Sequence, residues 1–366
     1  NSNFKPLPFS FDRASSATVV NKAGLIETVG SGEPRIDFSN DTKGALLLEP
    51  TRSNIAVNSE NFDAWTNGNL SLTSNADISP EGLNNAYKVT FNNLNHYLLY
   101  ADITVSSNTQ YTFSFYVKRG TATNLNYRLR DVGNSVDIIA PTSYYSQTSA
   151  SEWKRIEVTF TTPSNCTSLT IYSFSDGQSL GTAYIYGAQL EQGSYATSYI
   201  PTQGSAVTRV AETCNNGGNE QVINSTEGVL YAEISALENT VSQEVAFSIN
   251  DGVNNRLLVR FKTDGKIGFI AFTNGVGVRA IGETGVLDQS INRKIALKYK
   301  ENDYALWING IKVVVDNTST TFTLETLTKL SFEQGNNSNF LQGNCKDLRV
   351  YNTALTDQEL INLTTI

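Results

Sequence analysis

The stretch Tyr111-Thr-Phe-Ser-Phe-Tyr-Val-Lys118 alternates between apolar and polar side chains along its whole length. Successive side chains of an extended strand point to opposite faces, so each kind of side chain would occupy its own face. The buried face would carry Tyr111, Phe113, Phe115 and Val117. A strand with one buried and one solvated face is typical of antiparallel sandwiches.

Similar runs follow this stretch along the chain. Alternation recurs in residues 125–130, 155–160 and 184–191, while helical periodicity is nearly absent. Short alternating runs separated by Gly, Asn, Asp and Ser are the pattern of an all-β protein. We therefore predict a β-sandwich, or jelly roll, of about eight strands over residues 58–201.

A second β-sandwich is predicted over residues 227–366, because turn signals recur there at about the 8–12-residue spacing of sandwich strands. These signals are Asn250-Asp-Gly252, Asp264-Gly265 and Asn274-Gly275. Asn309-Gly310, between alternating apolar residues, predicts a type I′ hairpin. Thr356-Asp-Gln-Glu359 is a capping box and predicts a short C-terminal helix.

The two remaining segments contain only short apolar runs. Residues 1–57 have brief β-like pieces broken by Gly and Pro, and we predict a small N-terminal β arm that packs on a neighbour. Residues 202–226 are rich in Thr, Gly, Asn and Ser, which predicts a linker or long surface loop. The expected fold class is thus all-β, with a β arm followed by two sandwiches.

Composition excludes several functions. The 366 residues include 27 Lys and Arg against 35 Asp and Glu, which gives a net charge of −8. We therefore expect no surface that binds a phosphate backbone, and no nucleic-acid binding. One His and three Cys cannot build a His-rich zinc or iron site. No apolar run approaches bilayer length and no signal-peptide pattern opens the chain, so we expect no membrane insertion. A Cys214–Cys345 bridge is conceivable, but three free thiols are favoured.

Several motifs resemble bacteriophage tail and fibre proteins. The lead-in comprises Asp12-Arg-Ala-Ser-Ser-Ala-Thr18, Glu33-Pro-Arg-Ile-Asp37 and Leu46-Leu-Leu-Glu-Pro-Thr-Arg-Ser-Asn54. Residues 111–118 and 187–202 resemble the carbohydrate-binding-module-like jelly roll of such proteins. The third stretch resembles a concanavalin A/laminin-G-like lectin sandwich, on the Trp307-Ile-Asn-Gly310 hairpin and residues 346–360.

The resemblance implies a virion fibre or spike on the extracellular virion surface, attached to a host-surface polysaccharide through lectin-like domains. Other virion proteins would be its partners, and a homotrimer is expected from the likeness to fibres. Two alternatives stay open: a structural decoration or adaptor protein without glycan binding, and a glycan depolymerase. The single His and the lack of a motif pairing two carboxylates argue against an enzyme.

Sugar binding needs aromatic rings for stacking and planar hydrogen-bonding groups around them. If the strands at 111–118 and 125–130 are neighbours, Tyr116, Lys118, Arg128 and Arg130 would share a solvated face. Tyr144 and Tyr145, in a nearby loop, would close one side. The cations would favour an acidic glycan through bidentate Arg–carboxylate contacts. Ordinary solvated strand residues, or a subunit contact, remain an alternative interpretation.

Oxygen-rich turns in the second sandwich are weak calcium candidates. Asn250, Asp251, Asn254 and Asn255 share one turn, and Asn336, Asn337 and Asn339 share another. Such loops hold Ca²⁺ or sugar in some lectin-like folds. Plain hairpin-turn chemistry is favoured, because Asn, Asp and Gly build turns anyway and no EF-hand spacing is present. No other cofactor is expected.

Overall fold

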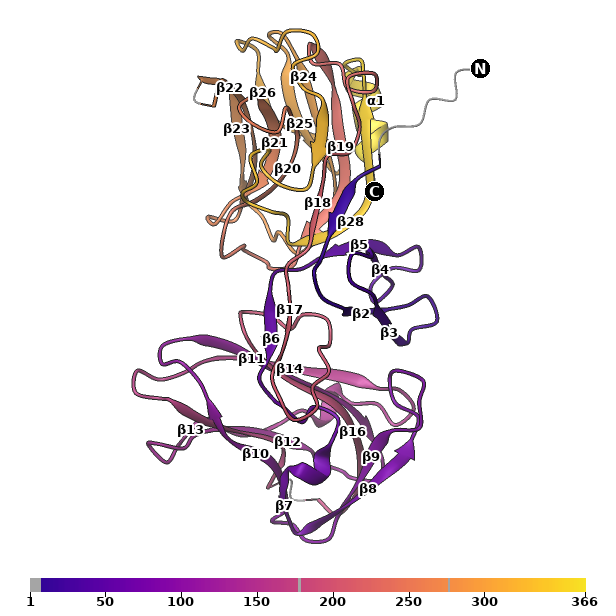
Figure 1. The fold of residues 1–366 in the computed structure, drawn as a ribbon, viewed down its shortest axis with the longest axis vertical. Coiled ribbons are helices and arrows are strands. Elements are labelled where there is room, and N and C mark those ends of the chain that lie inside the picture. Colours follow the sequence, from indigo (N-terminus) through magenta and orange to yellow (C-terminus); the bar gives the residue numbers. More distant parts are fainter. Residues whose placement is uncertain (1–7, 177–178, 276) are drawn as a thin grey trace. The chain divides into compact units, whose positions relative to one another are not determined.

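The computed structural model describes residues 8–176, 179–275 and 277–366. It is almost entirely β, which confirms the predicted fold class. The chain forms two compact units (Figure 1). The jelly-roll unit contains residues 15–30 and 51–210, and the C-terminal unit contains 31–50, 211–366 and the described part of 1–14.

The jelly-roll unit packs two five-stranded antiparallel sheets around one core (Figure 1). The first sheet runs in the order β13 (Val136–Ser143), β12 (Asn126–Asp131), β15 (Ser168–Ser175), β10 (Tyr97–Thr104) and β7 (Thr66–Gly68). The second runs β14 (Lys154–Thr161), β11 (Gln110–Arg119), β16 (Gly181–Gln192), β9 (Ala86–Phe91) and β8 (Leu70–Asp77). Two 3₁₀ turns, Phe62–Ala64 and Tyr145–Gln147, lie in its connections.

Strand β11 confirms the predicted buried face, but its other face is not solvated throughout, because Thr112 and Ser114 are also fully buried. Its apolar set is at most 5% exposed: Tyr111, Phe113, Phe115 and Val117. A hairpin of β2 (Ala17–Val20) and β3 (Ile26–Val29) also belongs to this unit. Its Ile26 is buried with Tyr186 and Tyr199 on the outer face of the second sheet, so that face is partly covered.

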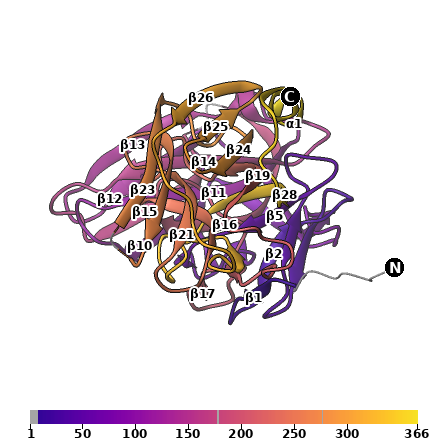
Figure 2. The ribbon, with the colours of Figure 1, turned by 90° about the horizontal axis from the view of Figure 1, so that it is seen from above.

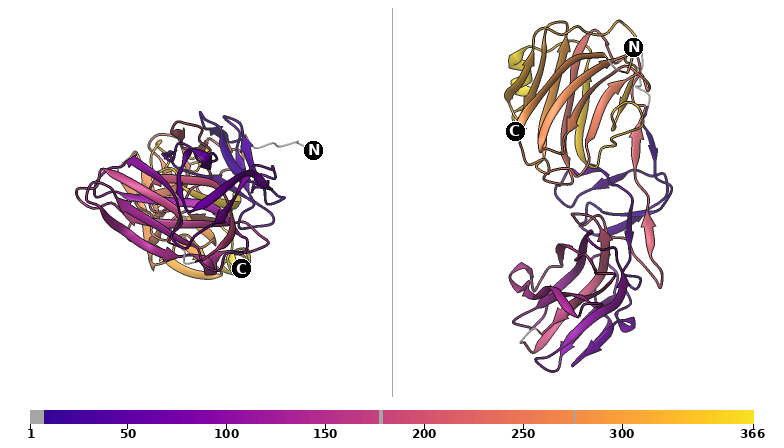
Figure 3. Two further views of the ribbon diagram at one scale, coloured as in Figure 1. Left: turned by 90° about the horizontal axis from the view of Figure 1, so that it is seen from below. Right: turned by 90° about the vertical axis from the view of Figure 1, so that its left-hand side faces the viewer.

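The C-terminal unit is the second predicted sandwich. Its larger sheet runs β26 (Ile311–Asp316), β25 (Tyr304–Ile308), β24 (Arg293–Lys300), β19 (Glu227–Ala236), β28 (Gly343–Tyr351), β5 (Ala45–Leu48) and β4 (Arg35–Asp37). The facing sheet runs β23 (Gly277–Val286), β22 (Lys266–Thr273), β21 (Arg256–Phe261), β20 (Val245–Asn250) and β27 (Lys329–Ser331). The right-hand view of Figure 3 shows these strands side by side.

Two local predictions in this unit are confirmed. Asn309 and Gly310 both have positive φ, 50° and 82°, between β25 and β26, as the hairpin turn requires. Helix α1 (Asp357–Thr364) begins with a complete capping box between Thr356 and Glu359. Figure 2 shows α1 beside β24 and β25. No described helix has the length and apolar character needed to cross a membrane.

The structure divides the N-terminal residues and the linker differently from the predicted arm and loop. Strands β4 and β5 extend the larger C-terminal sheet, because Leu46–Leu48 pair with the free edge of β28. β6 (Arg52–Asn54) pairs with β17 (Val207–Arg209), and β1 (Ser10–Asp12) pairs with β18 (Thr213–Asn215). Residues 8–57, the described part of the predicted arm, are therefore no separate body, and the 202–226 segment contributes strands to both units.

A buried ionic cluster joins these segments inside the C-terminal unit. Arg13 Nη1 lies 2.6 Å from Glu212 Oε1, and Arg35 Nη2 lies 2.8 Å from Glu49 Oε2. Arg35 Nε also donates to Glu212 Oε1 at 2.8 Å. Burial alone would lower the pKa of Arg35, but the two carboxylates raise that pKa above its ordinary value. The three Cys residues are free and buried.

Candidate functional site

The four charged and aromatic strand residues predicted as one site lie on opposite sheets. Tyr116 and Lys118 are on β11 of the second sheet, whereas Arg128 and Arg130 are on β12 of the first. After β11 the chain turns at residues 120–122, whose Gly120 and Ala122 N–H groups both donate to the Thr182 carbonyl at 3.1 Å. The following strand then enters the other sheet, so the predicted grouping is wrong.

Tyr116 and Lys118 belong to an aromatic cluster of the second sheet. The Tyr116 ring packs edge-on against Tyr199, with ring centroids 6.2 Å apart. The Lys118 ammonium lies 5.4 Å from the centroid of Trp153 and 5.2 Å from that of Tyr184, and it pairs with Asp77. These contacts hold Lys118 and its neighbouring rings in one cluster on the outer face of the second sheet, which is not the sheet of Arg128 and Arg130.

The predicted loop tyrosines are also packed. Tyr144 is fully buried, its hydroxyl donates to the Ser173 carbonyl at 2.9 Å, and its ring packs on Phe115. The prediction that Tyr144 contacts sugar is therefore wrong, since its apolar ring fills the core. Tyr145 is half-buried, and the guanidinium of Arg119 lies over its ring at 4.7 Å.

A different set of residues shares the outer face of the first sheet. We call this set the tyrosine face: Tyr97, Leu99, Asn126, Arg128, Arg130 and Tyr172. Their strand neighbours Leu98, Leu129 and Ile171 are fully buried on the inner face. Alternation therefore directs the tyrosine face away from the core.

The rings of this face are held by cross-strand pairing. Tyr172 lies directly opposite Arg128 on β12 and opposite Leu99 on β10. The Arg128 guanidinium lies over the Tyr172 ring, 5.2 Å from its centroid. Tyr97 covers Gly68 on β7, where a Cβ atom would come within 2.5 Å of the Tyr97 ring. Glycine at that position is what allows the ring to lie flat on the sheet.

Charges on this face are balanced. Arg128 Nε donates to Asp137 Oδ1 at 2.8 Å, and Arg130 Nη1 donates to the same oxygen at 3.3 Å. Arg128 Nη1 also lies 3.9 Å from Asp176. The charges of the two guanidinium groups and the two carboxylates therefore sum to zero. Several of their N–H donors and carboxylate lone pairs remain available to a hydroxyl-rich ligand.

One buried acceptor on this face has no partner. Asn126 is 9% exposed, and its amide nitrogen donates to the Asp176 carbonyl at 3.2 Å. Its Oδ1 makes no hydrogen bond with any described residue. An unpaired buried acceptor is rare in native proteins and often marks a ligand or water site. The alternation of residues 168–175 is the sequence signal that points Tyr172 outward, although Tyr172 was not among the predicted site residues.

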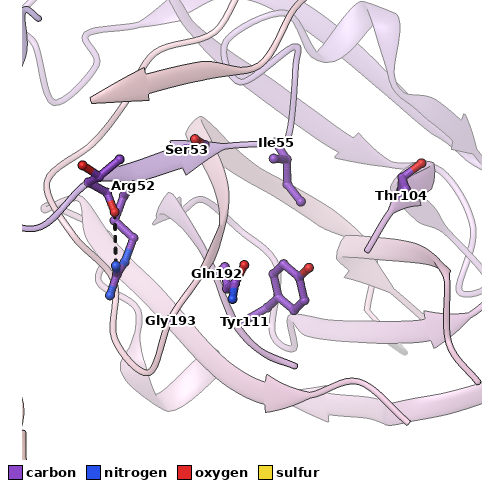
Figure 4. A pocket seen from close by; sticks show the side chains of 8 residues that line it. Arg52, Ser53, Ile55, Thr104, Tyr111, Gln192 and Gly193 are labelled. Atoms are coloured by element: carbon purple, nitrogen blue, oxygen red, sulfur yellow. Dashed lines mark hydrogen bonds between the residues drawn. The ribbon is translucent and has the colours of Figure 1, made fainter. Parts of the chain in front are cut away.

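A separate hollow of about 460 Å³ lies at one end of the jelly-roll unit (Figure 4). Its lining is Thr51, Arg52, Ser53, Ile55, Thr104, Tyr111, Gln192 and Gly193. Figure 4 shows the Arg52 side chain beside Gly193, and a Cβ there would come within 2.8 Å of Arg52 Nη2. Arg52 also stacks on Tyr195 and lies 3.8 Å from buried Glu191, so it is largely a packing element.

The oxygen atoms of the predicted calcium turn are occupied by the turn itself. Asp251 Oδ1 accepts the N–H groups of Val253, Asn254 and Asn255, and Oδ2 accepts the Asn255 amide. Asn250 is buried and its Oδ1 accepts the Gly252 N–H at 2.8 Å. Within the described ranges no three His, Cys, Asp or Glu side chains are grouped to hold a metal.

Comparison with known proteins points to carbohydrate binding. Residues 53–179, which contain the whole tyrosine face, match a family described as a carbohydrate binding domain. The chain is also similar to the tRNA nuclease WapA of Bacillus subtilis, 30% identical over 132 residues, and to a tRNA3(Ser)-specific WapA of Bacillus spizizenii, 29% identical. These matches cover 34% of this chain and span 6% of the length of the nucleases.

Two solved structures overlap more loosely. The CBM40 of the Ruminococcus gnavus IT-sialidase has 17% identity and a TM-score of 0.33, over 39% of this chain and 84% of that one. Domains LG4-5 of the mouse laminin alpha1 chain have 13% identity and a TM-score of 0.25, over 70% and 87%. The family match supports a carbohydrate-binding β-sandwich over residues 53–179.

Proposed function

We propose that the tyrosine face binds glycans, and that the chain is a bacteriophage fibre or spike protein that attaches the virion to a host-surface polysaccharide. The observation that carries the glycan part is the half-exposed Tyr97 and Tyr172 beside the guanidinium groups of Arg128 and Arg130 on one sheet face. The family match over residues 53–179 supports the same conclusion. The phage part rests on the resemblance of residues 12–54 and 187–202 to fibre proteins.

The chemistry of the face suits a sugar ring. Pyranose C–H surfaces would contact the half-exposed Tyr97, Leu99 and Tyr172, while hydroxyls accept hydrogen bonds from Arg128 and Arg130. Because the guanidinium groups are paired with Asp137, the face is preorganised and no side chain needs to be ordered on binding.

Attachment by a shallow face requires several copies. A single open sheet surface binds sugar weakly, and linked copies raise the overall avidity by about 10²–10⁴-fold. A homotrimer on the extracellular virion surface, held by other virion proteins, would supply those copies. The proposal is for binding without catalysis.

A polysaccharide panel tests this function. The purified chain is applied to immobilised neutral and acidic glycans, alongside the double variant Arg128→Ala/Arg130→Ala. We expect adsorption to at least one glycan and loss of most of it in the variant, with a nearly unchanged melting temperature. Failure of the wild-type chain to bind any glycan would reject the proposal and favour a structural adaptor. Release of oligosaccharides would favour a depolymerase.

A further inference from the structure

A cationic row on the C-terminal unit lies outside the tyrosine face. At one end of the smaller sheet, Lys329 on β27 lies opposite Asn250 on β20, and Asn250 lies opposite Arg256 on β21. Arg256 in turn lies opposite Phe272 on β22. By alternation from the buried Ile249, Leu257 and Ala271, these four side chains share the outer face.

Arg256 is a buried cation that makes no direct ion pair with a carboxylate of the described residues. It is 7% exposed and its Nε is completely enclosed without a hydrogen-bond partner. The guanidinium lies over the Phe272 ring, 4.6 Å from the centroid. Within the described ranges, no carboxylate forms an ion pair with Arg256 or Lys329, although most other cations of this unit have one. An uncompensated buried charge is costly, so its retention needs a reason.

The nearest carboxylates are committed elsewhere. Glu333 Oε2 accepts the backbone N–H groups of Asn336 and Ser338 at 3.0 and 3.3 Å. Asp251 accepts three backbone N–H groups of its own turn. Burial lowers the pKa of Arg256, and these two carboxylates only partly oppose that effect. Both carboxylates are near enough to act on the Arg256 charge, but within the described residues neither is in direct contact with the guanidinium or with the Lys329 ammonium.

The local backbone packs against the stems of the row. Gly335 lies over the stems of Asn250 and Arg256, where a Cβ would come within 2.7 Å of the Asn250 Cβ. Lys329 Nζ lies over the turn at Gly252, where a Cβ would come within 2.8 Å of it. The backbones of Arg256 and Lys329 are two strand spacings apart, or about 10 Å. Their long side chains can reach one anion bound between them.

We infer that Arg256 and Lys329 form a binding site for the carboxylate of an acidic saccharide, with the half-exposed Phe272 ring packing against the sugar. A guanidinium binds a carboxylate through two parallel hydrogen bonds, and the ammonium supplies a third. A bound carboxylate would also give Arg256 the direct ion pair that it lacks among the described residues. The site is independent of the tyrosine face.

The test measures binding of oligogalacturonate as the carboxylate probe and of heparin as the sulfate probe. Arg256→Gln and Lys329→Gln should each weaken oligogalacturonate binding about tenfold or more, as expected for losing a hydrogen bond to a charged group. Arg260→Gln is the matched control, because Arg260 is on the same strand and face but pairs with Glu244 at 3.5 Å. It should change binding less than twofold.

Folding of the variants is checked independently of binding. Removing an unpaired buried charge should leave the melting temperature of Arg256→Met equal to or above that of wild type. Oligogalacturonate should raise the melting temperature of wild type and not that of Arg256→Met. Three results would each overturn the inference: binding that neither Arg256→Gln nor Lys329→Gln weakens, tighter binding of heparin than of oligogalacturonate, or binding of neither probe. None of these results bears on Tyr172.

Discussion

The guanidinium of Arg128 lies over the ring of Tyr172, 5.2 Å from its centroid, across the β12–β15 pair of the jelly-roll unit. The stack fixes a tyrosine ring on the outer face of a sheet, and Asp137 fixes the arginine. Cation–π and ion-pair contacts at such half-exposed sites are worth only about 1 kcal/mol each. The contacts of Arg128 therefore do more to fix the positions of the Tyr172 ring and the guanidinium than to stabilise the fold.

Asn126 gives the first prediction about that surface. Asn126→Ala removes the enclosed Oδ1 acceptor together with the amide that holds the Asp176 backbone beside Arg128, so we expect glycan affinity to fall severalfold. Stability should change by less than about 1 kcal/mol, because the lost amide bond to Asp176 is offset by removal of an unsatisfied buried group. Titration of a bound oligosaccharide and urea unfolding check the two effects. A large stability loss with unchanged affinity would show that Oδ1 serves the fold alone.

Tyr144 is predicted to behave as a core residue. Tyr144→Phe keeps the ring and removes the hydroxyl that donates to the Ser173 carbonyl. The free energy of unfolding should therefore fall by about 0.5–1.5 kcal/mol. Glycan adsorption should not change. Weaker adsorption at unchanged stability would restore Tyr144 to the binding surface and contradict its burial.

The ionic cluster predicts a large stability effect. Glu212→Gln leaves Arg13 and Arg35 with one fewer buried carboxylate and should destabilise the protein by about 3–5 kcal/mol. Glu220→Gln, at an exposed position, is the control and should stay within about 0.5 kcal/mol. Equilibrium unfolding in urea measures both. Equal stabilities would mean that the cluster is not formed in solution.

Glu60 predicts a pH dependence of stability. Burial raises its pKa, while hydrogen bonds from Tyr199 and Tyr186 act in the opposite direction. The folded state therefore holds this proton more tightly than the unfolded state, whose Glu pKa is about 4.3. The stability that Glu60 contributes is complete below pH 4.3 and falls as pH rises through the raised pKa. Glu60→Gln should remove this decline in melting temperature. A variant curve parallel to wild type would contradict the shift.

Local sequence patterns predicted the strands well, because each is specified by nearby residues. The alternation of residues 111–118 placed Phe113 and Phe115 in the core, where both are fully buried. Asn309-Gly310 and the Thr356–Glu359 capping box specify their turn and helix end without help from the rest of the chain.

Which strands are neighbours in a sheet was harder to predict, and the residues that share the candidate site depend on those neighbours. Alternation says which face of a strand is buried, but consecutive strands that share a core lie either in one sheet or in opposite sheets. Lys118 and Arg128 fell on different sheets for that reason. The N-terminal segment was misjudged because its short strands β5 and β6 pair with β28 and β17, which are distant in sequence.

The most direct test of glycan binding compares two half-exposed tyrosines on opposite sheets. Tyr172 is on the tyrosine face, and Tyr184 is on the outer face of the second sheet. The affinity of an oligosaccharide from the bound polysaccharide is measured for wild type, Tyr172→Ala and Tyr184→Ala. We predict at least a tenfold loss for Tyr172→Ala and less than a twofold change for Tyr184→Ala. The opposite ranking, or equal losses, would contradict the assignment of glycan binding to the tyrosine face.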